Sequence, residues 1–185
     1  MTWSATERYR LEPAPGGLAL VQDLLNTVSA GTPPRPDLLV DPVDAQTWAD
    51  EATAAWAAAT GRAVPTVVIG AEGLRELRAF RDGLEEPAAE AGAAAELRLG
   101  ADGVVRLEPR GGTGPHLLVA LILAAVYEAQ RDDTRRRLKT CRNPVCRVAF
   151  YDRSRNNSGV WHDVKTCGNA ANLRAYRARQ RGRDA

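Results

Sequence analysis

Residues 141–183 read CRNPVCRVAFYDRSRNNSGVWHDVKTCGNAANLRAYRARQRGR and contain every cysteine of the 185-residue chain. Four possible metal ligands fall in two pairs, Cys141 with Cys146 and His162 with Cys167. Four residues separate the members of each pair, and 15 residues lie between the pairs. Zinc prefers four sulfur or nitrogen ligands in a tetrahedron, which two short-spaced pairs joined by a loop can supply. The spacing therefore predicts one closed, structural zinc site with no position left for a substrate.

The segment around this predicted site is poor in apolar side chains, so hydrophobic burial alone would not fold it. We expect zinc binding to supply folding free energy there. In a reducing compartment a disulfide framework is not expected. Three other interpretations stay open: incidental buried thiols, a three-cysteine site without His162, and a catalytic cysteine with His162 as its base.

The charge of the chain is divided unevenly along its length. Residues 131–185 carry 15 lysines and arginines against 5 acidic residues, a net charge of +10. The first 130 residues carry 10 against 18, a net charge of −8. A basic segment attached to an acidic body indicates an anionic partner, and beside a zinc site we expect that partner to be nucleic acid. The alternative is a charged face that contacts only solvent.

The residues after CGN predict a basic helix. Arg174, Arg177 and Arg181 are spaced by three and four residues, so they share one stripe. We expect Leu173 and Tyr176, on another face, to pack on the zinc module. The candidates for phosphate contact from this helix and the preceding loop are Arg153, Arg155, Lys165, Arg174, Arg177, Arg179, Arg181 and Arg183.

The rest of the chain predicts an α+β fold that is mostly helical. Asp44 and Gly61 are the expected N-cap and stop of one helix. The GADG sequence at residues 100–103 predicts a hairpin with a positive φ at Gly103. The expected elements are a short strand over 7–13, helices over 18–28, 45–60, 71–85, 116–137 and 168–181, and a hairpin over 96–109. We divide these into a mostly helical domain, 1–137, and a zinc module, 138–185, that ends in the basic helix.

Several classes of function receive no support from the sequence. No stretch reaches the roughly 18 apolar residues of a membrane-spanning helix, and the first residues lack the apolar core of a signal peptide. We therefore expect a cytoplasmic protein without a membrane partner. The first 137 residues hold one histidine, His116, and no phosphate-binding loop or acid–base pair. We expect no enzymatic activity.

The zinc segment resembles the CGNR zinc-finger family. The resemblance rests on Cys141, Cys146 and Trp161, on FYDRSRNNS at 150–158, on CGN at 167–169 and on RAYRAR at 174–179. The N-terminal part is similar, more loosely, to the ABATE domain of these proteins through LALVQDLLNTV, DLLVDPVDAQTWADE and LRELR. The family is described as stress-induced transcription regulators, so the resemblance implies zinc binding, DNA binding and a regulatory role.

The chain departs from the family pattern at informative positions. Where the family has Trp-Cys, this chain has Trp161-His162, an exchange of one zinc ligand type for another that supports His162 as the fourth ligand. The arginine after CGN is replaced by Ala170, and a basic residue two positions later by Asn172. A basic run before the tryptophan is replaced by Ser158, Gly159 and Val160. These exchanges imply weaker or different nucleic-acid contact.

Two functional hypotheses follow. In the first, the protein is a zinc-dependent DNA-binding regulator whose N-terminal domain binds an unidentified small-molecule ligand or forms a homodimer. In the second, the zinc module binds a protein, and its basic helix docks on an acidic partner or on the acidic N-terminal domain. Salt-dependent binding to duplex DNA separates the two.

Overall fold

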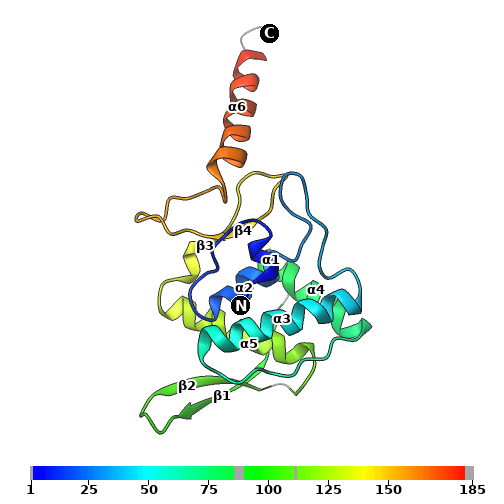
Figure 1. Ribbon diagram of the computed structural model, residues 1–185. Coiled ribbons are helices and arrows are strands. Elements are labelled where there is room, and N and C mark those ends of the chain that lie inside the picture. The colour runs from blue at the N-terminus through cyan, green and yellow to red at the C-terminus, as the bar shows by residue number, and fades with distance from the viewer. Residues whose placement is uncertain (1, 86–89, 111, 182–185) are drawn as a thin grey trace.

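The computed structural model describes residues 2–85, 90–110 and 112–181. A group of helices forms the body of the molecule, with a β-hairpin at one end and the zinc segment at the other (Figure 1). The last helix, α6 (Asn169–Arg181), projects from the zinc segment away from this body (Figure 1). The protein is thus a helical α+β protein with small two-stranded sheets, as the sequence predicted.

The short helix α2 (Leu18–Leu25) lies at the centre of the body, and all of its residues are buried. Three longer helices pack around it: α3 (Pro42–Thr60), α4 (Ala71–Glu85) and α5 (Pro115–Arg131). Apolar side chains from all four helices form one core, into which Trp48 and Trp56 of α3 also pack. Because α2 has no exposed face, its polar side chains must find partners inside the protein.

Local signals set the limits of α3. The Asp41 carboxylate accepts hydrogen bonds from the backbone N–H groups of Val43, at 2.8 Å, and Asp44, at 2.9 Å. Pro42 follows the cap directly, in the first helical position that suits proline. The expected cap at Asp44 was therefore wrong by three residues. Gly61 ends the helix in the left-handed region, with φ of 68°, as predicted.

The predicted hairpin is present. β1 (Ala94–Leu99) and β2 (Val105–Arg110) pair antiparallel, with Leu97 opposite Leu107 and Leu99 opposite Val105. Gly103 in the turn has a φ of 75°, which glycine adopts without strain. One face of the hairpin is apolar and the other is charged, because side chains alternate along each strand.

Two other expectations were wrong. Residues 7–13 form no strand: the short helix α1 (Ser4–Glu7) is followed by a turn and a loop. The Arg8 guanidinium there donates to the carbonyl oxygens of Val28, at 2.8 Å, and Pro36, at 2.7 Å. The helix expected to reach residue 137 ends at Arg131 as α5, and a 3₁₀ turn, η1 (Arg135–Arg137), follows it.

The zinc segment begins with two short antiparallel strands, β3 (Leu138–Thr140) and β4 (Ala149–Tyr151). A loop then leads to a π-helical turn, η2 (Val164–Gly168), which continues directly into α6. Leu138 and Ala149 belong to the same core as the helices of the body. The division into domains at residues 137 and 138 stays a prediction. Within the described residues, no helix is long and apolar enough to cross a membrane.

Candidate metal centre

The hairpin formed by β3 and β4 positions the first pair of predicted ligands. Cys141 follows β3, and its backbone N–H donates to the carbonyl of Val148 at 2.9 Å. Cys146 lies in the turn, where its N–H donates to the carbonyl of Asn143 at 2.8 Å. Both thiols are therefore held on one side of a rigid turn, and both are buried.

The second pair comes from the loop and the turn that precede α6. Asp163 caps η2 by accepting a hydrogen bond from the N–H of Lys165 at 2.8 Å. The Cys167 N–H donates to the Asp163 carbonyl at 2.9 Å, which directs the Cys167 thiol inward. His162 directly precedes the cap, so the same turn positions the imidazole and the last thiol.

All four predicted ligands meet in one cluster. One donor atom from each of Cys141, Cys146, His162 and Cys167 lies within 4.8 Å of the other three. The His162 Nδ1 is 3.3 Å from the Cys146 Sγ and 3.6 Å from the Cys167 Sγ. Zinc–sulfur and zinc–nitrogen bonds of about 2.3 Å and 2.05 Å at a tetrahedral angle place the two donors about 3.6 Å apart. The cluster therefore fits one structural zinc ion, as the spacing predicted.

The chemistry of the donor set also suits a cation. Hydrogen bonding from the Cys146 thiol lowers the pKa of Cys141 well below its usual value, despite the opposing effect of burial. The same contact and burial raise the pKa of Cys146. A divalent cation would offset the repulsion between neighbouring thiolates and allow all three to ionise. Three thiolates and one imidazole complete a tetrahedron, which is typical of a structural site rather than a catalytic one.

Asn143 joins the metal cluster to α6. Its side chain is buried, its Nδ2 donates to the Cys167 Sγ at 3.3 Å, and its Oδ1 accepts from the Arg174 Nη2 at 2.8 Å. No role for Asn143 was predicted from the sequence. Its position in the sequence between two predicted cysteine ligands was the signal that could have indicated this role, because thiolate ligands accept hydrogen bonds from nearby polar side chains.

The zinc segment is anchored on the buried polar face of α2. Asn26 directly follows that helix, and its side-chain amide pairs with both backbone groups of Ala149, donating to the carbonyl and accepting from the N–H, each at 2.9 Å. The Gly31 N–H donates to the carbonyl of the ligand Cys146 at 2.7 Å. These contacts join residues that are far apart in the sequence, and they fix the metal hairpin, which is the β3–β4 hairpin with its turn (residues 138–151), to the helical body.

A buried ion pair organises the loop between the two pairs of ligands. The Asp152 carboxylate accepts hydrogen bonds from the Lys139 ammonium, at 2.7 Å, and the Gly159 N–H, also at 2.7 Å. Burial raises the pKa of Asp152, but these hydrogen bonds outweigh it and hold that pKa well below its usual value. Lys139 also donates to two carbonyls of the loop, so this pair sets the path of the chain toward His162.

Comparison with known families agrees with this geometry. Residues 137–180 match the family model described as CGNR zinc finger. The match begins at the residue before β3 and ends within α6, so it includes all four ligands of the cluster. No curated protein matches the chain.

The candidates for phosphate contact differ in their surroundings. Arg153 forms an ion pair with Glu12 at 2.9 Å and donates to the Pro13 carbonyl at 2.7 Å. Arg174 contacts Asn143 as described above. Among the residues that the structure describes, the candidates with exposed side chains and no such tether to the body are Arg155, Lys165, Arg177, Arg179 and Arg181. Arg183 lies outside the described residues.

One expectation for α6 was wrong. Leu173 and Tyr176 do not pack on the zinc module, because they are 48% and 53% exposed. Apolar side chains that do pack around the metal cluster include Val148, which is fully buried, and Trp161, together with Tyr9, Leu11, Val28 and Ala30 from the N-terminal part of the chain. The helix stands away from the body (Figure 1), so neither Leu173 nor Tyr176 has a protein surface to cover it.

Proposed function

We propose that this protein is a DNA-binding transcription regulator in which a zinc-stabilised module presents α6 to duplex DNA. The observation that supports this best is the position of α6, which extends from the body (Figure 1). The arginine side chains of this helix are exposed. The 13 residues of the helix span about 20 Å, a length that fits a DNA major groove. The net charge of +10 over residues 131–185 favours the approach of a polyanion.

The zinc site has a mechanical role in this proposal. A helix as short as α6 is only marginally stable in water when nothing packs against it. Cys167 lies in the turn that continues into α6, and the contacts among Cys167, Asn143 and Arg174 tie the first two turns of the helix to the metal cluster. Metal binding would thus hold the start of α6 in place while the remaining turns stay available for DNA.

In this proposal the N-terminal part, residues 1–137, corresponds to the ABATE domain and has the regulatory role. It would bind a small molecule as the regulatory signal, form a homodimer, or do both. A homodimer would present two copies of α6 and so enlarge a small DNA footprint. Sedimentation velocity of the zinc-loaded protein over a range of concentrations tests this part of the proposal.

Fluorescence anisotropy with labelled duplex DNA over a range of salt concentrations tests DNA binding. We expect the affinity to fall steeply with salt. The double variant Arg177→Ala, Arg181→Ala should bind more weakly and reduce the slope by about 2, about 1 for each lost phosphate contact. The control is Arg75→Ala, an exposed arginine on the acidic body, which should leave both quantities unchanged.

A protein-interaction module is the second candidate, and ion pairs between the two halves favour it. Arg147 contacts Glu85 at 3.0 Å, and Arg153 contacts Glu12 at 2.9 Å, so basic residues of the zinc segment already bind acidic residues of the body. Under this hypothesis duplex DNA would bind weakly, and the Arg177 and Arg181 substitutions would have no effect on that binding. That result would overturn the DNA-binding proposal.

A further inference from the structure

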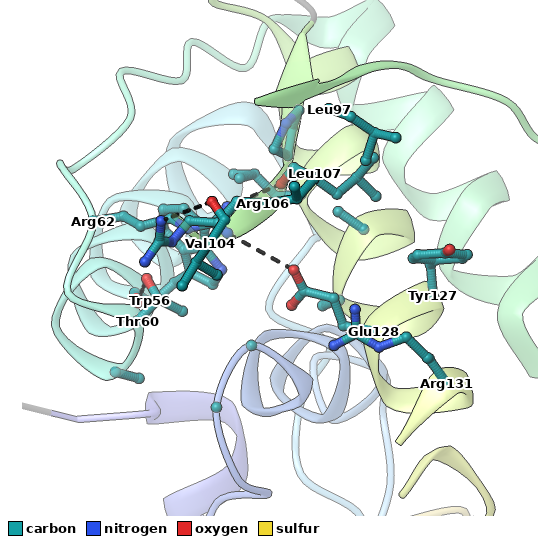
Figure 2. A pocket seen from close by; sticks show the side chains of 18 residues that line it. Trp56, Thr60, Arg62, Leu97, Val104, Arg106, Leu107, Tyr127, Glu128 and Arg131 are labelled. Atoms are coloured by element: carbon teal, nitrogen blue, oxygen red, sulfur yellow. Dashed lines mark hydrogen bonds and ion pairs between the residues drawn. The ribbon is translucent and has the colours of Figure 1, made fainter. Parts of the chain in front are cut away.

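A cavity of about 480 Å³ lies between the β1–β2 hairpin and the helices α3 and α5, at the end of the body far from the zinc segment (Figures 1 and 2). Its size falls within the range of about 300–1,000 Å³ that is typical of small-molecule sites. None of the residues that line this cavity was predicted from the sequence as a ligand contact.

Apolar side chains of the hairpin face this cavity without being covered. Leu97, Val105 and Leu107 lie on one face of the hairpin and line the cavity together with Trp56 of α3. Leu97 lies on the side turned toward the helices (Figure 2) and is nevertheless 71% exposed, and Val105, which also lines the cavity, is 56% exposed. The hairpin therefore leaves apolar surface that an apolar ligand could bury.

Arginine side chains line the same cavity. Arg62, Arg106 and Arg131 border it, together with one carboxylate, Glu128. Arg106 forms an ion pair with Asp102, and Arg131 forms one with Asp132 at 3.2 Å, so two of the three positive charges already have a carboxylate partner. Within the described part of the chain, Arg62 has only the more distant Glu128, at 3.7 Å, so the free positive charge that favours an anionic ligand is the one on Arg62.

Arg62 is the cation best placed to hold an anion. Its guanidinium has two weak polar contacts, at 3.7 Å to Glu128 and at 3.4 Å to the Leu107 carbonyl, and it lies 5.7 Å from the centre of the Trp56 ring. For comparison, the buried Arg81 contacts Asp37 at 2.9 Å. A guanidinium carries five N–H donors and binds a carboxylate through two of them, so Arg62 has capacity for a second anionic partner.

We infer that this cavity binds a small organic carboxylate with an apolar body. The carboxylate lies on the Arg62 guanidinium, and the apolar body lies between the hairpin leucines and the Trp56 ring. The inference rests on the sensory role proposed for residues 1–137 and names the class of molecule that would be sensed. It does not depend on DNA binding.

Isothermal titration calorimetry of the zinc-loaded full chain with octanoate, octan-1-ol and octylamine tests the inference. Octanoate should bind saturably at one site per chain, and at least about ten-fold more tightly than either analogue. Arg62→Gln should weaken octanoate binding about ten-fold or more. Glu128→Gln, which removes the competing carboxylate, should strengthen it. Arg75→Gln should bind octanoate as the wild type does.

The inference would be overturned by a lack of saturable octanoate binding, by equal binding of octanoate and octan-1-ol, or by unchanged octanoate binding in both Arg62→Gln and Glu128→Gln. Sedimentation of the same samples identifies a second copy of the chain as the occupant if octanoate shifts a dimer to monomer. That outcome would also contradict it. Measuring DNA affinity with and without octanoate separates the ligand site from the sensory role proposed for residues 1–137. If octanoate binds but DNA affinity does not change, the ligand site stands and its sensory role is refuted.

Discussion

Replacing Asn26 with alanine tests whether α2 holds the metal hairpin in place. In the folded protein the Asn26 amide makes two 2.9 Å hydrogen bonds with the backbone of Ala149, and both residues are fully buried. Alanine at position 26 would leave the N–H of Ala149 without a partner. The carbonyl would keep only the contact from Gln22, at 3.4 Å. An unpaired buried polar group costs about 1–3 kcal/mol, so we expect Asn26→Ala to reduce the free energy of unfolding by about 2–4 kcal/mol.

Urea unfolding of the zinc-loaded protein measures this loss, and transfer of zinc to a coloured chelator measures whether the metal site loosens with it. We expect both a lower unfolding midpoint and faster zinc release in Asn26→Ala. The control is Thr47→Ala on the exposed side of α3, which should change stability by less than about 0.5 kcal/mol. A similarly small change in Asn26→Ala, with unchanged zinc release, would refute the anchoring role.

Three further predictions concern the loop and the last helix. Asp152→Asn should destabilise the protein to a constant extent from about pH 8 to about pH 5. The pKa of Asp152 in the folded protein is lowered from its ordinary value of 3.8, so the ionised carboxylate stabilises the fold above that pH, and the contribution is lost only as the pH falls through the folded pKa. Urea unfolding of both proteins at each pH checks this, and a difference in stability that vanishes by about pH 6 would contradict it. Gly159→Ala should lower the melting temperature, because the added Cβ would lie 2.9 Å from the Asp152 carboxyl, whereas Gly83→Ala in α4, with no atom within 4 Å, should raise it slightly. Arg174→Ala should accelerate amide hydrogen exchange in α6 by up to about ten-fold, while the exchange rates of the helical body stay unchanged. An unchanged rate in α6 would show that the contact between Arg174 and Asn143 does not stabilise this helix.

Strong local patterns explain which parts of the fold were predictable. The helix over residues 71–85 carries its apolar residues on one face, and it appears as α4 with the predicted limits. The hairpin over 96–109 has alternating residues around a glycine-containing turn, and it extends by only one or two residues beyond the prediction. Each of these signals lies within the element itself.

Long-range contacts explain what could not be predicted. Arg8 lies in a segment whose composition resembles a strand, yet its guanidinium binds carbonyls about 20 residues away. Gln22, Asp23 and Asn26 are polar residues of a kind that usually faces solvent, but they are buried, and the side chain of Asp23 accepts a hydrogen bond from Trp48 while that of Asn26 pairs with Ala149. No local pattern distinguishes such a buried polar face from an exposed one.

The metal cluster was predictable for a different reason. Ligand chemistry restricts zinc to few residue types, and two short-spaced pairs of them are specific even without tertiary information. The same reasoning could not find Asn143 or Lys139, because asparagine and lysine occur on any surface. The expected packing of Leu173 and Tyr176 was wrong because α6 projects away from the body and leaves both side chains about half exposed.

The zinc content of the purified, reduced protein is the measurement that decides whether these four side chains form one structural site. Elemental analysis after exposure to a competing chelator should find one zinc per chain in the wild type and a clear loss in His162→Ala. His162→Cys, which restores a fourth ligand of the other common type, should retain the metal. Full retention in His162→Ala would mean that the fourth ligand lies elsewhere, and a wild-type protein without zinc would contradict the account of the metal site.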